Sequence, residues 1–521
     1  MGYHSALIPE ASNVSPAQAD RIAVRLLCDR NTHFKNPFGV REPILWVLAA
    51  ITIIGAALRV TFVFQPMRYD ESYTYITYVA RPLRTSISYY NCPNNHIFHT
   101  LMARECIAMF GAHPWVLRLP ALIFGTLMIP AAFFMAAAFF GPNVAILTSA
   151  LTASSSILVE YSTNARGYTI ECVCFLMILA IAKSLTLKSG ATRWRLFSVL
   201  SALGFYAIPV MLFPFGIVVV WMILDWLAKD AHSRDPQLPV RLLSSIALTT
   251  VIVFVLYIPV LANTGWRSLV ANRFITPQSG FLLKLLRYLA STWTLAVRDL
   301  PAPLIVVLIL GIGMSAFVAQ PSRGDALRLL AAVVLWSSTV LVTMRAVPDE
   351  RVWLFALPLF FALSLDGLRI LASSIPSRMV LVAPLLVAVL GYRTIYSGSI
   401  LNSRETGALP DGQAITLSLK PFLSEKCHVL GICPSDAILE YYFDRFDLSP
   451  LTVVTKVRRD DSGCLFAVTD EPEGQTLESV LSRGGVDPSE LKQATLLAHY
   501  AGGNVYKLEL TREHSSAVVS K

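Results

Sequence analysis

Two adjacent acids, Asp70 and Glu71, follow directly on a hydrophobic stretch that is long enough to cross a bilayer. A carboxylate at the edge of hydrocarbon loses solvation free energy unless it is paired, hydrated or used in chemistry, so such a pair is a candidate functional site. A carboxylate within hydrogen-bond reach of a hydroxyl group can remove its proton. Asp70, and after it Glu71, are therefore the candidate catalytic residues of this segment. The alternative is an acidic pair that faces water and anchors the chain at the membrane surface.

A second polar cluster, Asn91–His99, follows the acidic pair. Pro93 and the paired asparagines indicate a turn, which would place Asn95 and His96 at the N-terminus of a short helix. Backbone amides and the helix dipole favour an anion at such a position. The cluster therefore predicts anion binding, although an Asn-Asn-His run can also serve only as a helix cap.

Two more polar clusters, Glu160–Tyr168 and Arg345–Arg351, lie in short connections between apolar segments. Polar groups in so tight a turn at membrane level indicate a lined cavity rather than a spacer. Guanidinium groups match phosphate oxygens well, and Arg351 could instead pair with its neighbours Asp349 or Glu350. The candidate residues in the two clusters are Tyr161, Arg166, Tyr168, Glu350 and Arg351.

The elements that must position these residues are transmembrane helices. The chain has 521 residues, of which 55% are hydrophobic and 15% are charged, and its mean hydropathy is +0.57. Apolar runs long enough to cross about 30 Å of hydrocarbon recur along most of the chain and predict about eleven spans. We place them at 44–64, 116–139, 143–160, 168–187, 195–208, 209–228, 242–262, 301–319, 326–344, 351–370 and 379–396.

The distribution of basic residues predicts the sidedness of the membrane region, because Lys and Arg concentrate in cytoplasmic loops. The apolar segment His96–Phe110 is short and carries charges, so we predict that it lies along the interface and does not cross. One side then collects Arg21, Arg25, Arg30, Lys35, Arg41, Lys183, Lys188, Arg193, Arg195, Lys229, Arg234, Arg241, Arg323, Arg328, Arg369 and Arg378. That side is predicted to be cytoplasmic, and all four polar clusters fall outside.

The ends of the chain differ in character from its apolar centre. Residues 1–43 are predicted to be a cytoplasmic N-terminal segment, 44–396 the transmembrane module, and 397–521 a small external soluble α/β domain with alternating apolar runs. Cys427 and Cys433 are close enough in sequence to form a disulfide in an oxidising compartment, or they are free buried thiols.

In this order the clusters resemble the motifs of the GT-C fold glycosyltransferases, in the branch of the dolichyl-phosphate-mannose protein mannosyltransferases and the aminoarabinose transferase of lipid A. The likeness covers about residues 44–370. The matching runs are Tyr69-Asp70-Glu71, Pro93-Asn94-Asn95-His96, Arg118 to Gly125, Tyr161 to Tyr168, and Glu350-Arg351, after which Val352 replaces the family's aromatic residue.

The resemblance implies an inverting glycosyltransferase that moves a hexosyl or pentosyl group from a polyprenyl-phosphate donor to an acceptor hydroxyl on a lipid, glycan or protein. It also implies a multi-pass protein of the inner (plasma) membrane, with its catalytic loops and C-terminal domain on the periplasmic or extracellular side. Asp70 and Glu71 would then be catalytic, and Asn95, His96, Tyr161, Arg166, Tyr168, Glu350 and Arg351 would bind the donor. No ligand spacing predicts a metal site, and a divalent cation as cofactor stays open.

Other classes of protein fit parts of the pattern. A polytopic transporter or flippase of a lipid-linked or anionic substrate should carry polar residues along the middles of its spans and an internal repeat. A receptor or scaffold would leave the four clusters on one side without explanation. Nucleic acid is not expected as a partner, because phosphate recognition and cytoplasmic loops, rather than a continuous basic stripe, account for the net charge of +9.

Overall fold

The structure is a computed structural model that describes residues 42–91, 93–187, 190–270, 280–317, 322–369, 382–403, 408–424, 426–457 and 464–511. The predicted N-terminal segment therefore lies almost entirely outside the described residues. Contacts divide the chain into two units, Met1–Leu45 and Trp46–Lys521, and the description below concerns the second unit and the helix that leads into it.

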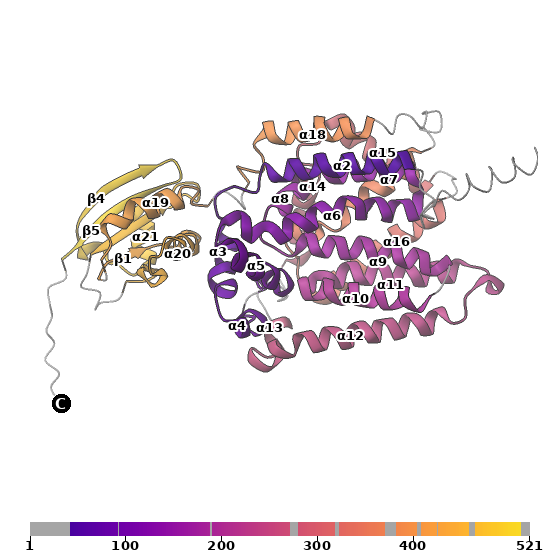
Figure 1. The fold of residues 1–521 in the computed structure, drawn as a ribbon, viewed down its shortest axis with the longest axis horizontal. Helices are drawn as coiled ribbons and strands as arrows, with labels where there is room; N and C mark the ends of the chain where they lie inside the picture. Colours follow the sequence, from indigo (N-terminus) through magenta and orange to yellow (C-terminus); the bar gives the residue numbers. More distant parts are fainter. Residues whose placement is uncertain are drawn as a thin grey trace, which may run out of the picture. The chain divides into compact units, whose positions relative to one another are not determined.

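A bundle of apolar helices forms most of the second unit, and Figure 1 shows these helices running in a common direction. Each predicted span coincides with a helix or a pair of helices. These are α2 (Glu42–Val60), α6 (Pro114–Phe140), α7 (Pro142–Ser154) with α8 (Ser156–Ser162), α9 (Tyr168–Leu187), α10 (Ala191–Ala207), α11 (Leu212–Ala228), α12 (Leu238–Asn263), α15 (Ala302–Phe317), α16 (Arg323–Met344), α17 (Ala356–Leu368) and α18 (Ala383–Ser397).

Not all of these helices are long enough to cross a membrane unaided. Among the described residues, six helices are long and apolar enough, or seven if the bent pair α7 and α8 counts as one span. The other four, α10, α15, α17 and α18, have 13 to 17 residues. The split predicted near Pro209 is confirmed, because a short 3-10 turn, Pro209–Met211, separates α10 from α11.

Close packing inside the bundle depends on small residues at helix crossings. At the crossing of α15 and α17, a Cβ atom on Gly367 would lie 1.8 Å from the carbonyl oxygen of Gly311. Any larger side chain would force the two backbones apart, as is usual where small residues let transmembrane helices approach closely.

The pair α7 and α8 is bent by 63° at Ser155. The break leaves backbone carbonyls at the end of α7 without helical partners. Arg59, which is fully buried, donates hydrogen bonds to the carbonyls of Ala153 and Thr152 and to the hydroxyl of Ser162. One side chain of α2 thus binds both sides of the bend.

The segment between α2 and α6 folds into short helices at one end of the bundle (Figure 1). They are α3 (Tyr69–Thr74), a π-helical turn (Tyr75–Val79), α4 (Leu83–Ser88) and α5 (Ile97–Phe110). The predicted helix over His96–Phe110 is therefore confirmed as an element, and it begins one residue later. Single π-helical turns are rare and occur often at functional sites.

The opposite ends of α9, α11 and α16 carry an ion-pair network. Lys183 pairs with Asp325, and Arg328 joins Asp325 to Asp225, which also pairs with Lys229. Lys183, Lys229 and Arg328 all belong to the set predicted to be cytoplasmic. Lys183 stands 15 residues along α9 from Tyr168, about 22 Å at 1.5 Å per residue, so this network and the polar cluster at Tyr168 lie at different ends of the bundle.

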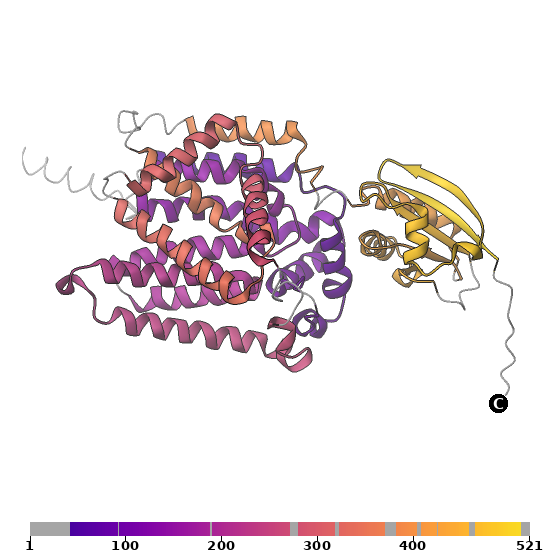
Figure 2. The same cartoon turned by 180° about the vertical axis from the view of Figure 1, so that it is seen from behind.

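The loop after α12 contains α13 (Arg267–Val270) and α14 (Phe281–Ala296). Helix α14 lies across the direction of the spans (Figure 2). Its leucines, among them Leu282, Leu286 and Leu289, are exposed, as suits an amphipathic helix at a membrane surface. Ser291 of α14 donates a hydrogen bond to Glu350, so this helix contacts the segment that carries the late arginine cluster.

The C-terminal region forms the predicted α/β domain. Its sheet has the order β2-β1-β3-β5-β4, with β1, β2 and β3 parallel and β5 antiparallel to both of its neighbours. The strands are β1 (His428–Leu430), β2 (Val453–Val454), β3 (Leu465–Asp470), β4 (Leu491–Tyr500) and β5 (Gly503–Leu510), and the helices are α19 (Gly412–Leu419), α20 (Ser435–Arg445) and α21 (Leu477–Arg483).

The structure does not contain the disulfide between Cys427 and Cys433 that was one of the two predicted alternatives. Cys427 forms a disulfide with Cys464, whereas Cys433 is an exposed residue outside this disulfide. The parallel pairing of β1 with β3 explains the difference, because it places His428 opposite Leu465 and so brings the residues before both strands together. Disulfides persist in oxidising compartments.

Thiol labelling of intact cells tests this arrangement. In a variant with serine at Cys28, Cys92, Cys106, Cys172 and Cys174, a membrane-impermeant maleimide should label one thiol, Cys433, without reductant. After reduction and denaturation, mass spectrometry should find three labels. Labelling of Cys427 or Cys464 without reductant, or protection of Cys433 in cells but not in lysates, would contradict the assignment.

Candidate active site

The turn that carries Asp70 is formed by an extended segment followed by a short helix. Arg68 has extended backbone angles and occupies the N-cap of α3, and its backbone N–H donates to the carboxylate of Glu71 at 3.1 Å. Asp70 and Glu71 thus stand in the first turn of α3, where the helix dipole favours negative charge.

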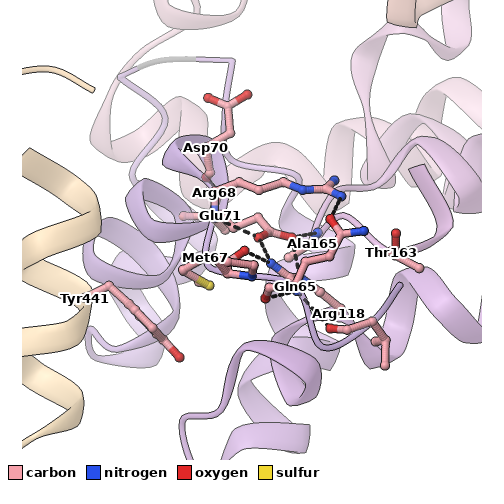
Figure 3. Close-up of polar contacts among 12 residues, drawn as sticks. Gln65, Met67, Arg68, Asp70, Glu71, Arg118, Thr163, Ala165 and Tyr441 are labelled. Carbon is pink, nitrogen blue, oxygen red and sulfur yellow. Dashed lines mark hydrogen bonds and ion pairs between the residues drawn. The ribbon is translucent and has the colours of Figure 1, made fainter. Parts of the chain in front are cut away.

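Glu71 points into the protein and forms a buried ion pair with Arg118 (Figure 3). Nε and Nη2 of Arg118 donate to the two carboxylate oxygens at 2.9 and 2.6 Å, and both side chains are fully buried. The backbone N–H of Ala165 donates to the same carboxylate at 2.7 Å. Glu71 therefore connects α3, α6 and the turn before α9.

The surroundings of Glu71 keep it charged although it is buried. Burial alone would raise the pKa of its carboxyl group, but the charge and hydrogen bonds of Arg118 lower the pKa below its usual value. Arg118 also donates to the backbone carbonyls of Val63, Gln65 and Pro66. The pair thus fixes the chain on both sides of the turn, and both carboxylate oxygens are engaged.

Asp70 points in a different direction and meets two arginines that are distant in sequence. Its Oδ2 lies 3.0 Å from Nη1 of Arg351 and 3.3 Å from Nη1 of Arg166. The side chain of Asp70 remains 23% exposed, whereas that of Arg166 is 4% exposed. Three of the four predicted polar clusters therefore converge on one partly open carboxylate.

The fourth cluster joins them through His96. The backbone N–H of Gly167 donates to Nδ1 of His96 at 2.6 Å, so Nδ1 carries no proton and the neutral ring has its proton on Nε2. His96 is 2% exposed, and its ring contacts that of Tyr168 edge to face. Burial, followed by the charge of Arg166, lowers the pKa of His96 well below 6.5. Nε2 has no hydrogen-bond partner among the residues that the structure describes, so His96 is a neutral donor at the site.

Tyr168 lies between these groups. Its ring contacts those of Tyr161 and His96, and the guanidinium group of Arg166 lies 5.9 Å from its ring centroid. Tyr161 is 5% exposed and supports Tyr168 from behind.

Two predicted donor-binding residues, Asn95 and Glu350, form hydrogen bonds with groups other than Asp70 and its arginines. Asn95 donates to the backbone carbonyls of Ser86 and Tyr89 and accepts a hydrogen bond from Thr100, so it fixes α4 against α5. Glu350 accepts from Ser291, while Asp349 accepts from the backbone N–H of Arg351 and so begins the turn that orients Arg351. The structure thus brings Asp70, His96, Arg166, Tyr168 and Arg351 together and assigns Asn95 and Glu350 to their support.

Three buried polar residues were missed by the sequence analysis as members of the site: Arg68, His99 and Arg118. The position of Arg118 near the start of an apolar span was the available signal, since charges there are rare and usually paired. His99 is fully buried, and neither ring nitrogen has a hydrogen-bond partner within the described part of the chain. Burial followed by the charge of Arg166 lowers the pKa of His99 to about 3.

The acids of the site do not form an evident metal-binding set. No group of three or more His, Cys, Asp or Glu side chains in the described parts of the chain could hold a metal ion. The two oxygens of Glu71 are occupied by Arg118, which leaves Asp70 as the accessible carboxylate. We therefore assign no step to a metal.

Comparison with known proteins establishes the fold. No protein-family model and no curated protein matches the chain. The oligosaccharyltransferase AglB from Archaeoglobus fulgidus, solved with an inhibitory peptide and a dolichol-phosphate, is 13% identical with a TM-score of 0.51, over 86% of this chain and 71% of that one. ArnT from Cupriavidus metallidurans bound to undecaprenyl phosphate is 15% identical with a TM-score of 0.48, over 89% and 98% of the two chains.

The likeness to AglB shows that this chain has the GT-C fold, a polytopic bundle of membrane helices followed by a soluble C-terminal domain. The fold predicted from the sequence motifs is therefore confirmed. At this level of identity the comparison shows the fold alone, and the chemistry has to be argued from the site.

The buried ion pair predicts a large effect of Glu71→Gln on stability. The amide keeps the shape of the side chain but leaves the buried guanidinium of Arg118 without a countercharge, which costs about 3–5 kcal/mol. Thermal unfolding of the purified protein in detergent should show a clearly lower midpoint. Asp70→Asn is the matched control, and its shift should be smaller because Asp70 is partly exposed. Equal midpoints for the two variants would contradict the structural role of Glu71.

The two buried histidines predict that stability falls as the pH falls. Because the pKa of His99 is lowered to about 3, the unfolded chain binds a proton near pH 6.5 that the folded chain does not, which removes at most about 1.4 kcal/mol per pH unit. His99→Phe should therefore flatten the loss of stability between pH 7 and pH 5. Chemical unfolding at both pH values measures the difference, and an unchanged pH dependence would show that folding does not shift the pKa of His99.

Proposed function

We propose that the protein is an inverting glycosyltransferase, which moves a sugar from a polyprenyl-phosphate donor to an acceptor hydroxyl at the outer face of the cytoplasmic membrane. The observation that carries the proposal is the partly exposed carboxylate of Asp70 between Arg166 and Arg351, beside the neutral donor His96. This arrangement offers both a proton acceptor and a phosphate site.

The two arginines suit the phosphate of the donor. Their Nη1 atoms approach a single carboxylate oxygen, Oδ2 of Asp70, from separate segments of the chain. A phosphate oxygen placed near that position would receive hydrogen bonds from both guanidinium groups, which stabilise the negative charge that develops on the leaving phosphate. Nε2–H of His96 is a further donor at the same place.

Asp70 is the base in this mechanism. When a phosphate engages Arg166 and Arg351, it weakens their hold on Asp70, and the carboxylate becomes a better proton acceptor. The acceptor hydroxyl then attacks the anomeric carbon, its proton passes to Asp70, and the bond from that carbon to the phosphate oxygen breaks. The polyprenyl phosphate leaves as an anion, so no strong general acid is needed. A single displacement of this kind inverts the anomeric carbon.

The remaining site residues have positioning roles in this proposal. Tyr168 offers a ring face beside Arg166, and Tyr161 holds that ring in place. Glu71 holds the turn of Asp70 through Arg118 rather than acting as a base, because both of its oxygens are occupied. Asn95 and Glu350 position the segments that carry His96 and Arg351.

Two observations support the external side of the inner (plasma) membrane. The ion pairs of Lys183, Lys229 and Arg328 lie at the other end of the bundle, as cytoplasmic charges should. The disulfide between Cys427 and Cys464 fits a periplasmic or extracellular C-terminal domain. AglB and ArnT, solved with dolichol-phosphate and undecaprenyl phosphate, support a donor of the same chemical kind.

A transporter or flippase explains the site less well. In the described residues, the groups that converge on Asp70 lie at one end of the bundle, not along a path through it. The buried Arg59 within α2 donates to backbone carbonyls and a hydroxyl, where it stabilises a bend. These features favour an enzyme.

Asp70→Asn should abolish transfer while the protein remains folded and inserted. The amide cannot accept the acceptor's proton, so kcat should fall by about 10²–10⁴, the usual contribution of general acid–base catalysis. The measurement is transfer from a polyprenyl-phosphate sugar by the purified protein in nanodiscs. Asp349→Asn is the matched control, because Asp349 also pairs with Arg351 but is more exposed, and it should retain most of the activity.

Native mass spectrometry separates binding from catalysis in the same variants. Wild type and Asp70→Asn should both retain a polyprenyl phosphate, and Arg351→Ala should lose it. Full transfer by Asp70→Asn would show that the base is another group. Absence of any retained polyprenyl phosphate and of any transfer by the wild type would overturn the proposed function.

A further inference from the structure

A cavity of about 470 Å³ lies outside the site described above, between the outer end of the bundle and the C-terminal domain. Residues from the segment before α3 and from the start of α6 line one wall, and residues of α19 and α20 line the other. The ones that matter for its chemistry are Gln65, Trp115, Asp411, Gln413, Tyr442 and Arg445. A cavity of this size suits a small ligand or one or two residues of a larger one.

The lining combines aromatic faces with planar polar groups. Trp115 and Tyr442 supply rings, and Asp411, Gln413 and Arg445 supply carboxylate, amide and guanidinium groups. The one acid and the one arginine among these residues balance in charge, so a strongly anionic ligand gains little there. A lipid tail would lose the hydrogen bonds of the polar groups. An uncharged ligand with many hydroxyl groups and apolar ring faces fits both kinds of surface.

Gln65 fixes the shape of the wall rather than facing the cavity with its amide. Its side chain is 6% exposed, and its Oε1 accepts a hydrogen bond from Arg68 at 2.7 Å. Figure 3 shows this amide turned toward Arg68 and Thr163. The polar groups available to a ligand are therefore those of Asp411, Gln413 and Arg445.

The cavity shares its wall with the turn that carries Asp70. The backbone carbonyls of Gln65 and Pro66 accept hydrogen bonds from Arg118, which also binds Glu71. The backbone N–H of Met67 donates to the hydroxyl of Tyr442. The same short segment therefore forms the floor of the cavity and leads into α3.

We propose that this cavity binds an uncharged glycan, as the hydroxyl-rich part of the acceptor. The identification of this glycan as part of the acceptor rests on the proposed function, whereas glycan binding itself can be tested without transfer. The aromatic faces stack on sugar rings, and the amide, carboxylate and guanidinium groups of Gln413, Asp411 and Arg445 bind their hydroxyls.

The test is binding of the full-length protein, in nanodiscs, to an array of neutral oligosaccharides, followed by titration with the oligosaccharide that binds best. Trp115→Ala and Gln413→Ala should each weaken binding at least tenfold. Gln413 is exposed on α19, so its substitution leaves the fold intact even if Trp115→Ala does not. Trp266→Ala is the matched control, because Trp266 is 63% exposed and does not line the cavity.

Retention of polyprenyl phosphate, read by native mass spectrometry, distinguishes this proposal from the proposed function. Gln413→Ala should keep the lipid and lose the oligosaccharide, whereas Arg351→Ala should do the reverse. Failure of wild type to bind any neutral oligosaccharide, or equal binding by wild type and both cavity variants, would overturn the glycan site. Loss of the lipid from wild type would instead count against the donor site alone.

Discussion

The buried ion pair between Glu71 and Arg118 is the constraint on which the site depends. An arginine near the start of an apolar helix needs a countercharge, and the adjacent extended segment supplies it from α3. The same guanidinium group binds the carbonyls of Val63, Gln65 and Pro66, which have no helical partners. The segment between α2 and α6 is therefore attached to the bundle at its base, and the turn of Asp70 is fixed relative to α6 and to the turn before α9.

Two neighbouring acids consequently have different environments. Glu71 is fully buried and held by Arg118, whereas Asp70, one residue earlier, points toward a partly open space and two arginines. Successive residues of a helix point about 100° apart, so a single turn of α3 is enough to separate a buried, paired carboxylate from a partly exposed one.

Much of the architecture could be predicted from the sequence because it follows from local patterns. The apolar runs located the helices of the bundle, and the change in composition after residue 397 indicated the α/β domain. The clustering of Asp70, Arg166 and Arg351 could be predicted only through the order of motifs, since 281 residues separate the first and last of them. The role of Arg118 could not be predicted, because its partner depends on how the loop folds back. Strand pairing likewise decided that Cys427 binds Cys464, 37 residues away, rather than the nearer Cys433.

The bend between α7 and α8 sets how far the chain travels before it turns back toward Arg166. Helix α8 has seven residues and would advance about 10 Å along the axis of α7 if it continued straight. Because it is inclined by 63°, it advances only about 5 Å along that axis. The turn after α8 therefore lies about one helical pitch closer to α7 than it would without the bend. The hydrogen bonds of Arg59 to both sides of the bend stabilise this position. A phosphate tethered to a lipid lies at a nearly constant height in a bilayer. Under the proposed function, the depth of this turn would therefore determine whether Arg166 meets a membrane-borne group or one that arrives from water.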